Sequence, residues 1–311
     1  MKVTVVGAGN VGSTCANVLA NNGVADEVLL IDIKEGLAEG KALDVWESAP
    51  VLGYDTRTVG YTSDYSKTAD SEVVIITSGV PRSPGMSRDD LVSINANIVK
   101  EVTGQLVQYS PKAKVIVVSN PLDVMTYTAF LTAKVPAKQV FGMAGVLDTA
   151  RFKSFIALEL NISVNEISAV IMGGHGDTMV ALPRYTTISG IPITELIDED
   201  RLNALVARTV KGGGEIVNLL GTSAWYAPGA AAALMAETIL KNQRRIFPIS
   251  CWLQGEYGLK DLYFGVPAIL GGDGIEKILE LKLNEKEMEL VNHSAKSVRE
   301  VQKVLVDMKL F

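Results

Sequence analysis

Short, continuously apolar runs alternate with helix-like segments through the first half of the chain. The runs are rich in β-branched residues, as is typical of strands buried on both faces of a sheet. They lie at Val3–Val6, Val28–Ile31, Val73–Ile76, Val115–Val118 and Val140–Met143. The amphipathic segments between them lie near 11–22, 36–48, 90–109 and 121–134. This strand–helix–strand alternation predicts a parallel sheet with helices on both faces, the doubly wound α/β fold.

The pattern changes near residue 145. The second half predicts a helix near 146–161, strands near 167–173 and 180–188, helices near 198–220 and 226–242, strands near 246–253 and 262–270, and a last helix whose apolar residues recur every three or four positions between Met288 and Leu305. A chain of 311 residues has room for about two domains. We therefore expect a doubly wound domain over 1–145 and a mixed α+β domain over 146–311.

A glycine-rich turn, Gly7-Ala8-Gly9-Asn10-Val11-Gly12, joins the first predicted strand to the first predicted helix. In that context its glycines permit a tight turn, close approach of the backbone to a pyrophosphate, and close packing of helix on strand. The helix N-terminus adds free N–H groups. Asp32, 20 residues after Gly12, ends the second strand, where a carboxylate accepts hydrogen bonds from a ribose and repels a 2′-phosphate. These features predict an NAD-binding Rossmann domain and favour NAD over NADP.

Composition and charge exclude other classes of protein. Asp and Glu (35) outnumber Lys and Arg (29), and the longest basic run is Arg244–Arg245, so we expect no binding to nucleic acid. Cys15 and Cys251 are far apart, so we expect neither disulfides nor a metal site. No apolar run is long enough for a membrane span and the amino terminus enters a strand at once, so we expect a cytoplasmic protein.

His175 is the candidate for proton transfer. It lies in Gly173-Gly174-His175-Gly176-Asp177 after a predicted strand, and the flanking glycines leave its ring approachable. An imidazole titrates near neutral pH and can exchange a proton beside a hydride transfer; a lone histidine can equally be structural. A carboxylate that orients the ring would complete the pair, and both Asp148 and Asp177 are candidates.

Asp148 and Arg151 lie three residues apart at the start of a predicted helix and share one of its faces. They form either a helical ion pair or a functional unit in which Arg151 binds a substrate carboxylate and Asp148 holds His175. Arg82 and Arg88 lie in the loop after Val73–Ile76, which either closes over a ligand or carries surface charge. Asn120, after the next strand, contacts ligand or forms a turn.

These motifs resemble those of the lactate/malate dehydrogenase superfamily over the whole chain. The resemblance rests on MKVTVVGAGNVG, VSNPLDVMTY, GMAGVLDTARF and GGHGD. Among members, the chain is most similar to bacterial malate dehydrogenases of the lactate-dehydrogenase-like type. The resemblance implies a reversible NAD-dependent oxidation of (S)-malate to oxaloacetate, carried out by a homo-oligomer, with a tetramer favoured over a dimer.

The resemblance also implies a role for each candidate residue. The turn from Gly7 to Gly12, Asp32, Asn95 and the segment Val118-Ser119-Asn120 hold the cofactor. His175 gives and takes the proton and is paired with Asp148. Arg151 binds the carboxylate beside the reacting carbon, Arg88 polarises the carbonyl, and Asn120 also contacts substrate.

The resemblance further implies that Arg82 distinguishes between the substrates of the family. Malate dehydrogenases of this family carry Arg at that position and lactate dehydrogenases carry Gln, so Arg82 matches a second carboxylate. The alternatives are an L-lactate or other 2-hydroxy-acid dehydrogenase and a non-catalytic NAD-binding protein. The latter is expected to lose His175, Arg151 or Arg88, and all three are present.

Overall fold

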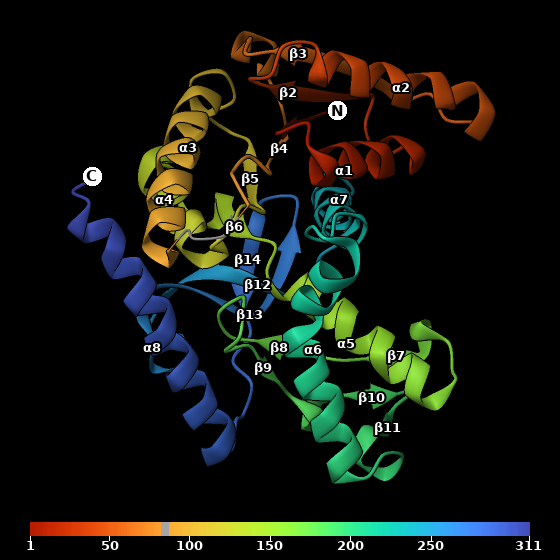
Figure 1. The fold of residues 1–311 in the computed structure, drawn as a ribbon, viewed down its shortest axis with the longest axis vertical. Helices are drawn as coiled ribbons and strands as arrows, with labels where there is room; N and C mark the ends of the chain where they lie inside the picture. Colours follow the sequence, from red (N-terminus) through yellow and green to blue (C-terminus); the bar gives the residue numbers. More distant parts are fainter. Residues whose placement is uncertain (82–86) are drawn as a thin grey trace.

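A computed structural model describes residues 1–81 and 87–311, without the side chain of Arg88. Within these residues, the largest sheet has the strand order β14-β13-β12-β6-β5-β4-β1-β2-β3 (Figure 1). Its parallel strands are β1 (Lys2–Val6), β2 (Glu27–Asp32), β3 (Arg57–Thr62), β4 (Val73–Ile76), β5 (Lys114–Val117) and β6 (Val140–Gly142). The order 3-2-1-4-5-6 is that of a dinucleotide-binding sheet, which places a ligand crevice at the carboxyl ends of the strands where the order reverses.

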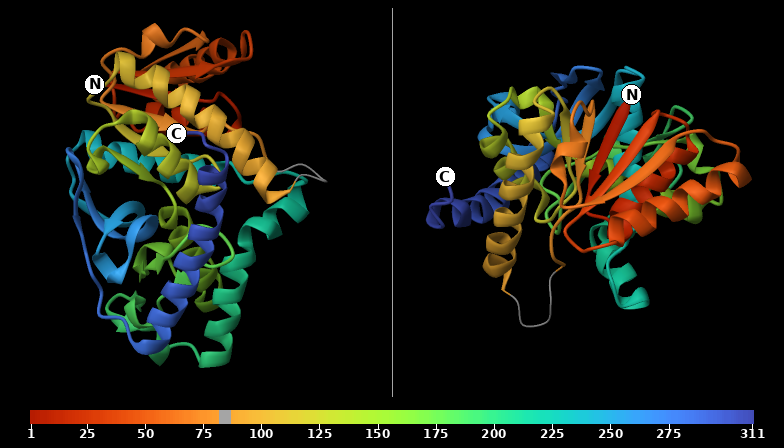
Figure 2. Two further views of the ribbon diagram at one scale, coloured as in Figure 1. Left: turned by 90° about the vertical axis from the view of Figure 1, so that its left-hand side faces the viewer. Right: turned by 90° about the horizontal axis from the view of Figure 1, so that it is seen from above.

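Helices cover both faces of the parallel strands (Figure 2). One face carries α1 (Asn10–Asn21), α2 (Leu37–Leu52) and α7 (Tyr226–Leu240), and the other carries α3 (Arg88–Tyr109) and α4 (Leu122–Ala133). Helix α8 (Glu285–Asp307) packs against α3, α4 and strand β13. The apolar runs are continuous because neighbouring residues enter different cores. Val5 packs with the α1 and α7 side, and Val6 with the α3 and α4 side. The predicted doubly wound α/β fold is therefore confirmed.

Three antiparallel strands extend the same sheet beyond β6. They are β12 (Arg245–Gln254), β13 (Lys260–Gly271) and β14 (Gly274–Ile278). Strand β12 joins β6 where Ser250 pairs with Gly142. The division into domains over 1–145 and 146–311 remains a prediction, because strands from both halves share this sheet.

A third core lies between α5 (Gly145–Leu160) and α6 (Glu199–Leu220). Short strands accompany it: β7 (Ile167–Ser168), β8 (Ile171–Met172), β9 (Val180–Ala181), β10 (Thr187–Ile188) and β11 (Ile191–Pro192). The continuous strands predicted over 167–173 and 180–188 are therefore wrong. Strands β7 and β8 belong to different sheets, and a 3-10 turn at Pro183–Tyr185 separates β9 from β10. Proline lacks the N–H that a continuing ladder needs.

The sequence patterns missed β3 and β14, which lie at the two edges of the large sheet. In β3, only Thr58 is buried, and Gly60 interrupts the side-chain pattern. That glycine is required, because a Cβ there would lie 2.1 Å from the carbonyl oxygen of Ala38 in α2. An edge strand that packs its backbone against a helix carries no continuous apolar run.

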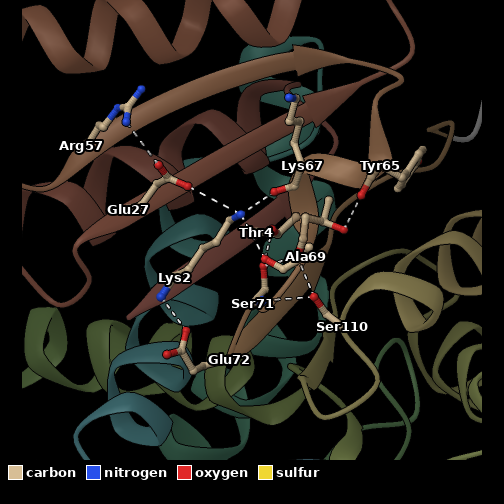
Figure 3. A network of polar contacts seen from close by, with 11 residues as sticks. Lys2, Thr4, Glu27, Arg57, Tyr65, Lys67, Ala69, Ser71, Glu72 and Ser110 are labelled. Atoms are coloured by element: carbon tan, nitrogen blue, oxygen red, sulfur yellow. Dashed lines mark hydrogen bonds and ion pairs between the residues drawn. The ribbon is translucent and has the colours of Figure 1, made fainter.

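The amino ends of β1, β2 and β4 meet in a network of polar contacts (Figure 3). The Lys2 ammonium donates to the carbonyl of Ala69 at 3.2 Å and pairs with Glu27 at 3.6 Å. The hydroxyls of Thr4 and Ser71 are 2.8 Å apart. The glycine-rich turn follows the opposite end of β1, so this network stabilises the edge that lies away from the crevice.

None of the helices in the described part of the chain combines the length and apolarity needed to cross a membrane.

Candidate active site

The glycine-rich turn has the geometry that its spacing predicts. It lies between the end of β1 at Val6 and the start of α1 at Asn10. Gly7 has a φ of +99°, and a Cβ on Gly12 would lie 1.8 Å from the Gly7 carbonyl oxygen. A Cβ on Gly9, by contrast, would meet no described protein atom within 4 Å. Contacts within the protein therefore do not require glycine at position 9. A pyrophosphate that lies against the backbone at the N-terminus of α1 would require it.

The Asp32 carboxylate lies beside this turn. One oxygen accepts a hydrogen bond from the Ala8 N–H at 2.7 Å and the other from the Lys34 N–H at 2.9 Å. A carboxylate has further lone pairs on both oxygens. Asp32 is therefore fixed at the carboxyl end of β2 with acceptor capacity left for ribose hydroxyls.

The carboxyl ends of β4 and β5 are tied to each other by Asn95, a residue of α3 that is 1% exposed. Its Oδ1 accepts from the Val80 N–H at 2.8 Å, and its Nδ2 donates to the Asn120 carbonyl at 2.7 Å. The side chain thus connects Val80, at the start of the loop after β4, to the turn after β5. The predicted contact between Asn95 and the cofactor remains a prediction.

The segment after β5 presents one accessible side chain. Val118 and Ser119 are buried, and the Ser119 hydroxyl donates to the Ser78 carbonyl. Asn120 is exposed, and it lines a cavity of about 620 Å³ together with His175. The structure therefore brings Asn120 and His175 to the same cavity.

His175 and Asp148 form a pair in which the carboxylate is buried and the imidazole is partly exposed. Asp148 lies in the first turn of α5 and is 1% exposed, and its Oδ2 is 2.8 Å from Nδ1 of His175. Asp177, the other candidate partner, is exposed to solvent. The geometry therefore selects Asp148. With an ionised carboxylate at Nδ1, that nitrogen carries the proton and Nε2 is left for exchange with a substrate.

Arg151 forms an ion pair with the other oxygen of the Asp148 carboxylate. Its Nη1 is 3.4 Å from Asp148 Oδ1, and its side chain is 12% exposed. Asp148 therefore holds both the imidazole and the guanidinium, as the i, i+3 spacing allows.

Asp123, a buried carboxylate in the first turn of α4, was missed by the sequence reasoning. Its Oδ2 accepts from the backbone N–H of His175 at 2.9 Å, and its Oδ1 accepts from the Ser250 hydroxyl at 2.7 Å. The available signal was an aspartate three residues after Asn120 in an otherwise apolar segment. Asp123 fixes the backbone from which the imidazole projects.

The charges around His175 oppose the effect of its burial. Burial lowers the pKa of the imidazole, but the charge and hydrogen bond of Asp148, together with the charge of Asp123, raise it further than burial and Arg151 lower it. The net pKa of His175 is raised above its ordinary value. Burial also raises the pKa of the Asp123 carboxyl, which the hydrogen bonds from Ser250 and His175 offset only in part. The site therefore favours an imidazolium at neutral pH more than water does.

Two of the predicted substrate-binding residues are not placed by the structure. Arg82 lies outside the described residues, and Arg88 begins α3 without a described side chain.

Comparisons with known proteins identify the family of the chain. The model of the lactate/malate dehydrogenase NAD binding domain matches residues 1–142, and the model of the α/β C-terminal domain of the same family matches residues 145–307. The malate dehydrogenase of Cytophaga hutchinsonii is 63% identical over 305 residues, which cover 98% of each chain.

Solved structures give the same result. The malate dehydrogenase of Salinibacter ruber superimposes with a TM-score of 0.96 at 53% identity, covering 99% of each chain. A lactate dehydrogenase of Cryptosporidium parvum, solved with lactic acid and nicotinamide adenine dinucleotide, superimposes with a TM-score of 0.94 at 38% identity, covering 98% of this chain and 97% of that one. With both domain models matched and relatives similar over nearly its full length, this chain belongs to the lactate/malate dehydrogenase family.

Proposed function

We propose that this chain is an NAD-dependent malate dehydrogenase that converts (S)-malate and NAD⁺ reversibly to oxaloacetate, NADH and a proton. The observation that carries the proposal is the contact between His175 and the buried Asp148, with Arg151 on the same carboxylate, in a chain that also holds a dinucleotide-binding turn. A proton carrier, a carboxylate clamp and a nicotinamide cofactor are the groups that oxidation of a 2-hydroxy acid requires.

The cofactor is held by residues at the carboxyl edge of the sheet. The turn from Gly7 to Gly12 takes the pyrophosphate and Asp32 takes the adenosine ribose. The Val118-Ser119-Asn120 segment takes the nicotinamide half, with Asn95 acting through its hydrogen bond to the Asn120 carbonyl. When bound, NAD supplies the acceptor for the hydride that leaves C2 of malate. The negative charge of Asp32 disfavours the 2′-phosphate of NADP.

His175 moves the proton. In malate oxidation, neutral His175 accepts the hydroxyl proton at Nε2 while Nδ1–H stays on Asp148, which is 2.8 Å away. Asp148 thereby stabilises the imidazolium that forms. In oxaloacetate reduction, the imidazolium gives the proton back to the carbonyl oxygen.

The arginines recognise the carboxylates. Arg151 binds the carboxylate next to the reacting carbon through two hydrogen bonds, and Arg88 polarises the carbonyl, with Asn120 as a further contact. Arg82 meets the second carboxylate of oxaloacetate. An L-lactate dehydrogenase is the alternative assignment, and the charge of Arg82 argues against it because pyruvate offers only a methyl group.

The active form is proposed to be a homo-oligomer, with a tetramer expected. The family resemblance carries this proposal, and α2 is consistent with it because Leu43, Trp46, Val51 and Leu52 are exposed in the single chain. Sedimentation equilibrium measures the state directly: a mass near four chains supports the tetramer, and a monomer overturns the proposal.

The assignment is tested by NADH oxidation with and without oxaloacetate. We expect oxidation that depends on oxaloacetate, and that is lost in His175→Asn while NADH binding is kept. His293→Asn is the matched control, because His293 is exposed on α8. Equal turnover in both variants would remove His175 from the mechanism.

A further inference from the structure

Three consecutive glycines, Gly212, Gly213 and Gly214, lie within α6. Glycine is among the weakest helix formers. Three in succession therefore need a reason in the surroundings of the helix. Helix α6 packs against α5, which carries Asp148 and Arg151.

The three positions have different surroundings. A Cβ on Gly212 would lie 2.2 Å from Cδ and 2.9 Å from Nε of Arg151. A Cβ on Gly213 would lie 4.0 Å from Nη2 of the same arginine, and one on Gly214 would meet no described atom within 4 Å. Gly212 is buried and Gly214 is exposed. The Arg151 side chain therefore crosses α6 directly over Gly212.

Arg151 is confined from two sides. Asp148 lies on one side, 3.4 Å from the guanidinium, and the bare backbone of α6 lies on the other. The three atoms nearest to a Cβ at position 212 all belong to the Arg151 side chain. A methyl group there would consequently displace the arginine rather than another part of the fold.

We propose that Gly212 is a positioning residue for Arg151: its missing side chain provides the space in which the guanidinium is held against Asp148 and aimed at the substrate carboxylate. The inference rests on the proposed role of Arg151. An ordinary contact is longer than 3.4 Å, so a methyl group 2.2 Å from Cδ requires a displacement of more than 1 Å.

The test compares Gly212→Ala with Gly214→Ala. For Gly212→Ala we expect kcat/KM for oxaloacetate to fall about 10- to 100-fold, since a misplacement of about 1 Å costs on the order of 100-fold. The loss should appear mainly as a higher KM, because Arg151 binds the carboxylate in ground state and transition state alike. The Kd for NADH should stay within about twofold, a change too small to indicate damage to the cofactor site. In Gly214→Ala, kcat/KM and KM for oxaloacetate and the Kd for NADH should all stay unchanged.

A double variant separates positioning from general damage. Arg151→Ala removes Cγ, Cδ and Nε, so Gly212→Ala should lower neither kcat/KM nor the melting temperature further in that background. An equal loss from Gly212→Ala with and without Arg151 would overturn the inference. If Arg151→Ala impairs turnover but Gly212→Ala behaves like Gly214→Ala, the inference about Gly212 also fails. If Arg151→Ala itself leaves turnover unchanged, it is the proposed role of Arg151 that fails.

Discussion

Replacing Asp148 by asparagine should lower the apparent pKa that governs the pH dependence of kcat/KM. Asp148 Oδ2 is 2.8 Å from Nδ1 of His175, and the pKa of that imidazole is raised because Asp148 and Asp123 outweigh burial and Arg151. The asparagine side chain would keep a polar contact with the imidazole but lose the charge. Burial and the Arg151 cation would then act on the imidazole with only Asp123 to oppose them.

The magnitude follows from the contact. An opposite charge within about 4–6 Å shifts a pKa by about 1–3 units. We therefore expect the pKa of His175 to fall by about 1–3 units in Asp148→Asn, equivalent to about 1.4–4 kcal/mol at 1.36 kcal/mol per unit. Oxaloacetate reduction needs the imidazolium, so kcat/KM is constant below this pKa and falls above it. The pH at which kcat/KM begins to fall is called the break. At pH values above the break of the unmodified enzyme, kcat/KM for oxaloacetate should be about 10- to 1000-fold lower in the variant.

The assay is the pH dependence of kcat/KM in both directions. The break should lie above the ordinary histidine value of about 6.5 in the unmodified enzyme and at least about one unit lower in Asp148→Asn. Malate oxidation should rise through the same break, because it needs neutral His175. Both breaks reflect titration of the same imidazole, so loss of the Asp148 charge should move them in the same direction.

The control is Asp177→Asn, which removes an equal charge two residues from His175 but from an exposed side chain. Its break should stay close to that of the unmodified enzyme. A break that stays or rises in Asp148→Asn would refute the electrostatic account. An equal shift in Asp177→Asn would show that the pairing of His175 with Asp148 does not set the pKa.

Three further predictions concern the rest of the site. Asp32→Ser should narrow the preference for NADH over NADPH, measured as the ratio of kcat/KM for the two cofactors; equal use of both by the unmodified enzyme would contradict it. Asp123→Asn keeps an acceptor for the His175 N–H but loses a charge that raises the pKa of His175, so its pH break should fall by less than that of Asp148→Asn. If Arg82 binds the second carboxylate as proposed, Arg82→Gln should lower kcat/KM for oxaloacetate by roughly 30- to several-thousand-fold and raise activity with pyruvate, because loss of one partner of a desolvated charge pair costs about 2–5 kcal/mol. A ratio of the two specificities that moves by less than about tenfold would mean that Arg82 does not select the substrate.

The parallel sheet was predictable because each of its central strands is buried on both faces. Val5 and Val6 enter different cores, which produces an uninterrupted apolar run. Strand β3 lies at the edge and packs the backbone of Gly60 against α2, so it leaves no such run. Sequence periodicity therefore identifies central strands better than edge strands.

The site was predictable where a short motif carries it and not where distant segments meet. The turn from Gly7 to Gly12 and the spacing of Asp148 and Arg151 can be recognised locally. The choice of Asp148 over Asp177 depends on α5 lying beside the segment after β8, which local spacing does not reveal. The contact between Gly212 and Arg151 joins residues on two different helices, and a run of glycines alone does not identify its partner.

Initial rates with oxaloacetate and with pyruvate, measured side by side with NADH on the unmodified enzyme, show which of the two substrates the enzyme prefers. In the proposed mechanism, Arg82 and Arg151 each bind one carboxylate of oxaloacetate, and pyruvate would leave Arg82 without a partner. We expect kcat/KM for oxaloacetate to exceed that for pyruvate by at least about 30-fold, the lower end of the cost of leaving one partner of a desolvated charge pair unpaired. Equal values, or a preference for pyruvate, would contradict the assignment as a malate dehydrogenase.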